Sequence, residues 1–115
     1  MPPQIVSAAI SRDELRRIAE QQFGDFVKAV VDVQRQLMAI GAELHADEGA
    51  VLMQDGSRPG DLWGINLYLA RAGDDLIEFD SMINVRPSQG NRSREVEDAA
   101  IQRLIRNIVG RLVGP

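Results

Sequence analysis

The stretch LWGINLYL at residues 62–69 decides the fold that the sequence predicts. Large apolar side chains alternate along it with small or polar ones, and this period of two is typical of a β-strand with one buried face. Turn-forming residues bound the stretch on both sides, at 54–61 and at 70–75. Because short connections join neighbouring antiparallel strands, the stretch predicts the middle strand of an antiparallel meander.

The segments beyond these turns predict the two partner strands. Residues 43–53 alternate in a similar way, with a bulge expected at Gly49. Residues 76–86 also alternate and end at Pro87, which cannot donate a hydrogen bond to a sheet. In the middle strand Trp63 and the alternate residues after it would face the core, while Asn66 and Tyr68 would face away.

Helical periodicity marks the segments before the predicted sheet. Ser11 and Glu14 have the spacing of a capping box, and they predict a helix over 11–22. From residue 25 to 40 an apolar stripe predicts a second, longer helix that Gly41 would close. The alternative reads residues 27–33 as a strand, because β-branched valines favour strands. We prefer the helix because its stripe persists for about four turns.

The order of these elements predicts an α+β domain. With a last helix from about Ser93, the order is α-α-β-β-β-α, and a two-layer sandwich would carry the helices on one face of a three-stranded antiparallel sheet. Residues 1–10 would form an N-terminal tail and residues 11–113 a single domain. A chain of 115 residues with 44% apolar content suits one hydrophobic core.

Composition narrows the classes of partner and compartment. Acidic residues outnumber basic ones by 17 to 13, so general attraction to nucleic acid or to an anionic membrane is not expected. The sequence has no apolar run of membrane-spanning length and no signal-like N-terminus. It also lacks cysteine, which fits a reducing environment. We therefore expect a cytoplasmic protein whose chemistry comes from oxygen and nitrogen groups.

Polar side chains collect on the face of the predicted sheet that points away from the core. Strand alternation places on it Glu43, His45, Asp47, Asn66, Tyr68, Glu78, Asp80, Asn84 and Arg86. The simplest reading is the solvated side of a two-layer sandwich. The alternative is a functional site, because Asp and Asn are poor strand formers and clustered carboxylates need a compensating charge.

In the second reading the carboxylates would hold a metal ion. Asp47, Glu78 and Asp80 supply the oxygen ligands that Mg²⁺ or Mn²⁺ prefers. His45 is the only histidine, and an ordinary histidine pKa of about 6.5 suits proton transfer at neutral pH. His45 is therefore the candidate catalytic residue.

The segment from Glu78 to Arg94 is the best candidate for a ligand site, because its strand ends in a polar loop that leads into the last predicted helix. Backbone N–H groups at a helix start, arginine forks and hydroxyl groups together favour an anion such as phosphate. The candidate ligand-binding residues are Asn66, Asn84, Arg86, Asn91, Arg92, Ser93 and Arg94. A structural reading is also open, in which Ser93 only caps the helix and the acidic residues after it favour its positive end.

Three motifs resemble a known family. ELHADE at 43–48, LWGIN at 62–66 and IEFDSMINVRPSQGNRS at 77–93 resemble a small family of uncharacterised prokaryotic proteins, a domain of unknown function. The resemblance covers most of the chain from the first predicted helix onward. It implies a stand-alone bacterial or archaeal cytoplasmic domain and brings no functional residues with it.

Two functions stay open on these grounds. In the first, the polar sheet face and the 86–94 loop bind a small anionic ligand of the phosphate type, with or without a divalent metal. In the second, the domain has no catalytic role and binds another protein chain, for example as a homodimer, through a sheet edge or an exposed apolar helix surface.

Overall fold

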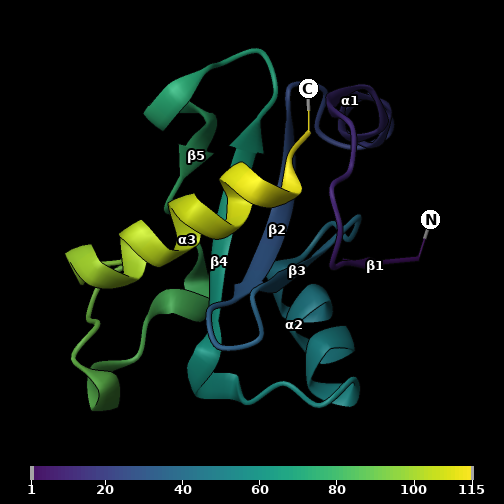
Figure 1. Ribbon diagram of the computed structural model, residues 1–115. Helices are drawn as coiled ribbons and strands as arrows, with labels where there is room; N and C mark the ends of the chain where they lie inside the picture. The colour runs from purple at the N-terminus through teal and green to yellow at the C-terminus, as the bar shows by residue number, and fades with distance from the viewer. Residues whose placement is uncertain (1, 115) are drawn as a thin grey trace.

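A computed structural model describes residues 2–114, which form three α-helices and one five-stranded antiparallel sheet (Figure 1). The strand order across the sheet is β1-β3-β2-β4-β5. The helices are α1 (Arg12–Gln21), α2 (His45–Gln54) and α3 (Ala99–Leu112). The strands are β1 (Gln4–Val6), β2 (Phe26–Asp32), β3 (Leu37–Ile40), β4 (Leu62–Tyr68) and β5 (Ile77–Glu78). The mixed α/β class is confirmed, although the sheet has more strands than the sequence predicted.

The long helix predicted over residues 25–40 is wrong, because this segment forms the hairpin of β2 and β3. Asp32 makes the turn: its Oδ1 accepts hydrogen bonds from the N–H groups of Gln34 and Arg35, both at 2.9 Å. Gln36 then takes a left-handed conformation with φ of 58°. The alternative reading of residues 27–33 as a strand was therefore the correct one.

The strand predicted over residues 43–53 is also wrong, because this segment forms α2. Asp47 lies in its first turn, where an acidic side chain favours the positive end of a helix. Gly49 is an ordinary helical residue, so the predicted bulge is absent.

The strand predicted over residues 62–69 is confirmed as β4. It pairs with β2 along its whole length, from Phe26 opposite Tyr68 to Asp32 opposite Leu62. The third predicted strand is shorter than expected, because β5 contains only Ile77–Glu78 and the chain then continues through short 3-10 turns. The edge of β4 beyond β5 is therefore open to side chains from these turns.

The first helix matches its prediction closely, and the last helix is present with a later start. Ser11 caps α1 by accepting a hydrogen bond from the Glu14 N–H at 3.1 Å. The last helix begins later than predicted, at Ala99, and its cap is Asp98 rather than Ser93. The segment predicted as an N-terminal tail includes β1, which pairs with β3 and buries Val6.

Helices cover both faces of the sheet, which corrects the predicted two-layer sandwich. The larger core joins α1 and α3 to the face of β2 and β4 that carries Val27, Ile65 and Leu67. The smaller core lies on the opposite face, where Leu52 of α2 packs near Val30.

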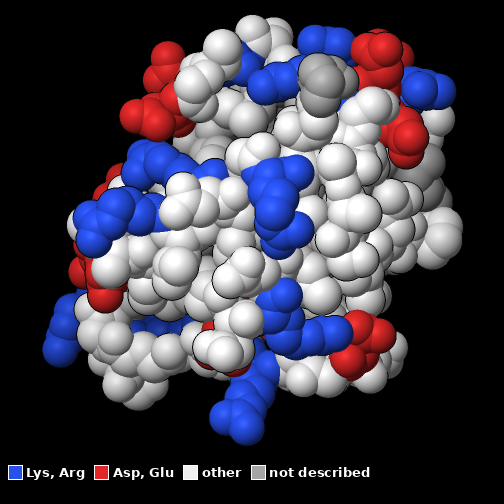
Figure 2. All heavy atoms as spheres, viewed as in Figure 1, with Lys and Arg blue, Asp and Glu red and all other residues white. Residues whose placement is uncertain are grey.

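Figure 2 shows the face that α3 covers, where basic groups are separated by uncharged atoms and acidic groups lie near the margins. No helix formed by residues 2–114 has the length and apolar character needed to cross a bilayer.

Candidate functional site

A polar row crosses three strands on the face opposite α3. Lys28 of β2 lies opposite Asn66 of β4, and Asn66 lies opposite Glu78 of β5. In the next row along the strands, Phe26 lies opposite Tyr68, and their rings stack with centroids 5.1 Å apart. The two rows together are half-buried. We call the row of Lys28, Asn66 and Glu78 the floor, and the stacked rings of Phe26 and Tyr68 the aromatic wall.

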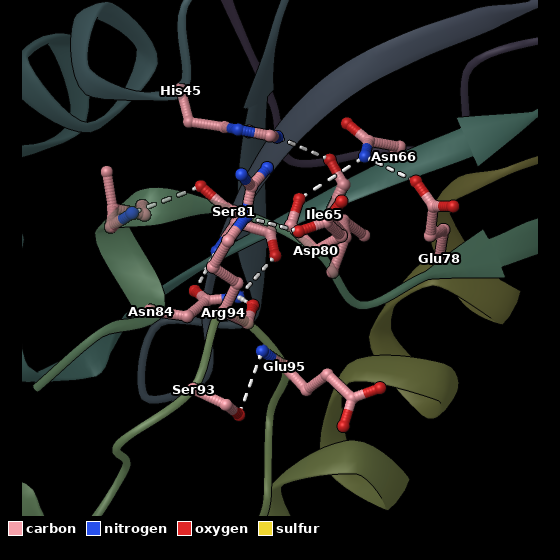
Figure 3. Close-up of polar contacts among 12 residues, drawn as sticks. His45, Ile65, Asn66, Glu78, Asp80, Ser81, Asn84, Ser93, Arg94 and Glu95 are labelled. Atoms are coloured by element: carbon pink, nitrogen blue, oxygen red, sulfur yellow. Dashed lines mark hydrogen bonds and ion pairs between the residues drawn. The ribbon is translucent and has the colours of Figure 1, made fainter.

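The start of α2 closes the other side of this floor. His45 is buried, and its Nε2 lies 2.8 Å from the Ile65 carbonyl oxygen of β4 (Figure 3). Between the floor, α2 and the turns after β5 lies an open hollow of about 520 Å³. Its lining consists of Phe26, Lys28, Leu44, His45, Ala46, Asn66, Tyr68, Glu78, Asp80, Ser81, Met82, Ile83 and Arg94.

Gly64 allows this close approach of α2 and the turns to β4. A Cβ atom at Gly64 would lie 2.5 Å from the Ser81 Cβ and Oγ atoms, and 3.2 Å from the His45 Cγ atom. Asn84 then occupies the open edge of β4: its Oδ1 accepts from the Gly64 N–H at 2.8 Å, and its Nδ2 donates to the Gly64 carbonyl at 2.9 Å. The Asn84 amide thereby replaces a missing strand partner.

Burial favours the neutral form of His45. Because a carbonyl oxygen only accepts, Nε2 carries a proton and donates a hydrogen bond to Ile65, and in the neutral form Nδ1 is then an acceptor. Burial lowers the pKa of His45, and Lys28 lowers it further, while the hydrogen bond to Ile65 and the charge of Asp80 oppose the shift. The hydrogen bond to Ile65 occupies Nε2, and the pKa of His45 is lowered. Both observations favour a positioning role for His45 over a catalytic one.

Glu78 and Asp80 have different partners, although both carboxylates line the hollow. The Nδ2 of Asn66 donates to Glu78 Oε1 at 2.8 Å, and the Tyr68 hydroxyl donates to the same oxygen at 3.5 Å. Burial and the charge of Glu78 raise the pKa of Tyr68. Asp80 instead pairs with Arg94, with 2.7 Å between Oδ1 and Nε (Figure 3).

Three of the predicted ligand-binding residues are used by the protein itself. Asn84 and Asn91 are buried, and the Nδ2 of Asn91 donates to the carbonyls of Asn84, Ser93 and Glu95. Arg86 donates to the carbonyls of Ile83, Pro59, Gly60 and Leu62, and its guanidinium lies 4.3 Å from the centroid of the Trp63 ring. Burial lowers the pKa of Arg86. These side chains hold the turns in place and do not line the hollow.

The predicted anion site in the loop holds an internal carboxylate. Glu97 Oε2 accepts from the N–H groups of Arg92 and Ser93, at 2.9 Å and 2.7 Å. Hydrogen bonding with the Ser93 hydroxyl group and with the N–H groups of Ser93 and Arg92 lowers the pKa of Glu97. In this loop an internal carboxylate therefore occupies the backbone N–H groups of Arg92 and Ser93, where the sequence analysis expected an external anion.

The predicted metal ligands are not brought together. Glu78 and Asp80 line the hollow, whereas Asp47 is exposed on α2 and does not line it. Within residues 2–114, no group of three or more His, Asp or Glu side chains is arranged to hold a metal ion.

The hollow includes residues that the sequence reading did not assign to a site, among them Phe26, Lys28 and Ser81. Phe26 and Lys28 were assigned to a helix, and only the strand alternative would have placed them on the polar face. Strand alternation puts Ser81 on the opposite face from Asp80, but the chain leaves the strand after Glu78, so both line the hollow. Lys28 carried one further signal, since it is the only lysine in the sequence.

Residues 4–112 match the family described as "Protein of unknown function (DUF5674)", and the chain belongs to this family. No curated protein and no solved structure matches the chain. The function must therefore be argued from the hollow itself.

Proposed function

We propose that the domain binds a small polar ligand with an anionic group, such as a phosphate or a carboxylate, in the hollow over Lys28, Asn66 and Glu78. The observation that carries this proposal is the Lys28 ammonium group, which has no carboxylate within ion-pair distance among residues 2–114 and whose Nζ lies 5.1 Å from the centroid of the Phe23 ring. A charge in a partly desolvated site is stabilised by a counter-ion, and an external anion would supply one here.

The other lining residues support the same proposal. Burial lowers the pKa of His45 and so favours its neutral form, which does not compete with Lys28 for the anion. Arg94 uses Nε for Asp80, and its terminal N–H groups have no hydrogen bond to residues 2–114, so they can donate at the rim. The proposed function is binding, and it includes no metal ion because Asp47 lies outside the hollow and Asp80 is already paired.

The single lysine gives a direct test. Reductive methylation with ¹³C-formaldehyde labels Lys28 and the N-terminal amine, and the two signals are distinguished with the Lys28→Arg variant. We expect inorganic phosphate or acetate to shift the Lys28 methyl signal in a saturable way and to raise the melting temperature. Chloride at equal ionic strength is the control for screening. A Lys28 signal that responds equally to every salt would contradict the proposal.

Exposed apolar side chains beside the hollow favour a second candidate function, association with another copy of the chain. Leu44 and Met82 are 57% and 67% exposed at the rim, and Met53 is 44% exposed further along α2. A second hollow of about 270 Å³ lies beside Met53 and Ile83. Clustered apolar side chains of this kind are typical of contact surfaces. Sedimentation velocity tests this: a dimer that Leu44→Glu dissociates supports it, and a monomer at all concentrations removes it.

A further inference from the structure

The hollow contains two opposite charges that the protein does not pair. Lys28 and Glu78 lie two strands apart on the same row, which corresponds to roughly 9–10 Å between their Cα atoms. Neither side chain forms an ion pair with any of residues 2–114. Asp80 differs from Glu78 in this respect, because Arg94 neutralises it.

Glu78 can accept a hydrogen bond from a further donor. Its two partners, Asn66 and Tyr68, are uncharged donors, and both of them use Oε1. Oε2 has no hydrogen bond within the described part of the chain and is not one of the buried unpartnered atoms. A carboxylate with one oxygen fixed and the other free is oriented for a cationic donor such as an ammonium group.

The formal charges of the residues that line the hollow sum to zero. Lys28 and Arg94 are balanced by Glu78 and Asp80, while His45 is neutral. A simple anion would satisfy Lys28 and leave Glu78 unpaired beside it, with a net negative charge added to the hollow. A ligand that carries one charge of each sign satisfies both side chains and keeps the site neutral.

We propose that the ligand is a small zwitterion, with its anionic group on Lys28, an ammonium group on Glu78 and its apolar body against the Phe26–Tyr68 wall. This inference rests on the proposed function, because it assigns the anionic group to the same lysine. The aromatic pair supports it further, because Phe26 and Tyr68 line the hollow next to both charges and offer it an apolar surface. This surface consists of ring edges, since Phe23 stacks on Phe26 and the Arg71 guanidinium lies 4.0 Å from the centroid of the Tyr68 ring. The chemical class is that of amino acids and related amino-carboxylates.

A series of amino-carboxylates from glycine to ε-aminocaproate tests the inference, because it varies the separation between the two charges. Isothermal titration calorimetry measures each compound against n-butylamine and butyrate, which carry only one of the charges. We expect an affinity maximum within the series and no comparable binding of either single-charge compound. Glu78→Gln should weaken the best amino-carboxylate about tenfold or more, and Lys28→Met should do the same. Asp47→Asn, which removes an exposed carboxylate outside the hollow, is the matched control and should bind like the wild type.

The outcomes separate this inference from the proposed function. If butyrate binds as well as the amino-carboxylates and Glu78→Gln has no effect, the anion site stands and the zwitterion inference is wrong. If no compound of the series binds and Lys28 methyl signals do not respond to anions, both are wrong. Melting temperatures of the variants without ligand show whether a loss of binding reflects a loss of folding.

Discussion

Glu48 is fully buried where α2 packs on the sheet, and burial raises the pKa of its carboxyl group to about 9. Its Oε2 accepts from the Ala42 N–H at 3.1 Å, while Oε1 has no hydrogen-bond partner in the part of the chain that the structure describes. The unfolded chain ionises the same group near its ordinary pKa of 4.5. Between these two values the folded state holds one more proton than the unfolded state. The free energy of unfolding should therefore fall as pH rises, by up to about 1.4 kcal/mol per pH unit.

We expect Glu48→Gln to remove this fall, because the amide keeps the acceptor for Ala42 and cannot ionise. Urea unfolding at several pH values from about 5 to about 9 measures the slope in both proteins. Glu43→Gln is the control, since Glu43 is exposed and close in sequence. Equal slopes for the wild type and Glu48→Gln would show that Glu48 is not held protonated.

Gly64 is the residue on which the closure of the hollow depends. Gly64→Ala would place a methyl group 2.5 Å from Ser81 and force α2 or the turn at Ser81 away from β4. We expect a loss of about 1–3 kcal/mol in the free energy of unfolding, measured by chemical denaturation. The matched control is Gly49→Ala, whose methyl group would meet only the Leu62 side chain at 3.9 Å. This change within α2 should stabilise the protein by about 0.5–1 kcal/mol, so two losses of similar size would contradict the packing argument.

At the scale of elements, the sequence predicted those whose large apolar residues follow a regular period and missed those whose apolar residues do not. β4 and α3 present a regular apolar pattern, and both were found. β2 buries both of its faces, so its apolar residues are nearly continuous and also fit a helix. The inward face of α2 is His45, Glu48, Gly49 and Leu52, which have helical spacing but are mostly not apolar. A hydrophobic pattern cannot reveal a helix whose buried side is polar.

The open edge of β4 depends on a single side chain, Asn84, because β5 ends before it reaches Gly64. Asn84→Ala would leave the Gly64 N–H and carbonyl without partners and would also remove the donor to the Arg94 carbonyl at 3.0 Å. Each buried group left unpaired costs about 1–3 kcal/mol, so we expect a loss of at least about 2 kcal/mol in chemical denaturation. The exposed Asn107→Ala in α3 is the control and should stay within about 0.5 kcal/mol of the wild type.

At the scale of the whole molecule, several residues of the predicted polar site line the hollow, but not all of them reach it from the element that the sequence predicted. Asn66, Glu78 and Asp80 lie together as strand alternation indicated. His45 reaches the same hollow from the start of a helix rather than from a neighbouring strand. Arg86 and Asn91 are close in sequence to the hollow, but they bind backbone carbonyls instead. Strand alternation depends only on neighbouring residues of one strand. Whether a side chain binds a carbonyl group that is distant in sequence depends instead on how the complete chain packs.

The two cores share the backbone of one sheet, so we expect the molecule to unfold as a single unit. Leu52→Ala opens the smaller core, and Ile105→Ala opens the larger one; each should cost about 2–5 kcal/mol. The only tryptophan, Trp63, lies in the larger core, so its fluorescence reports that core alone, while far-UV circular dichroism reports all three helices. If β2 and β4 couple the two layers, Leu52→Ala shifts both transitions to the same lower urea concentration. A fluorescence transition that stays at the wild-type midpoint while circular dichroism shifts would mean that α2 and its core unfold independently of the rest.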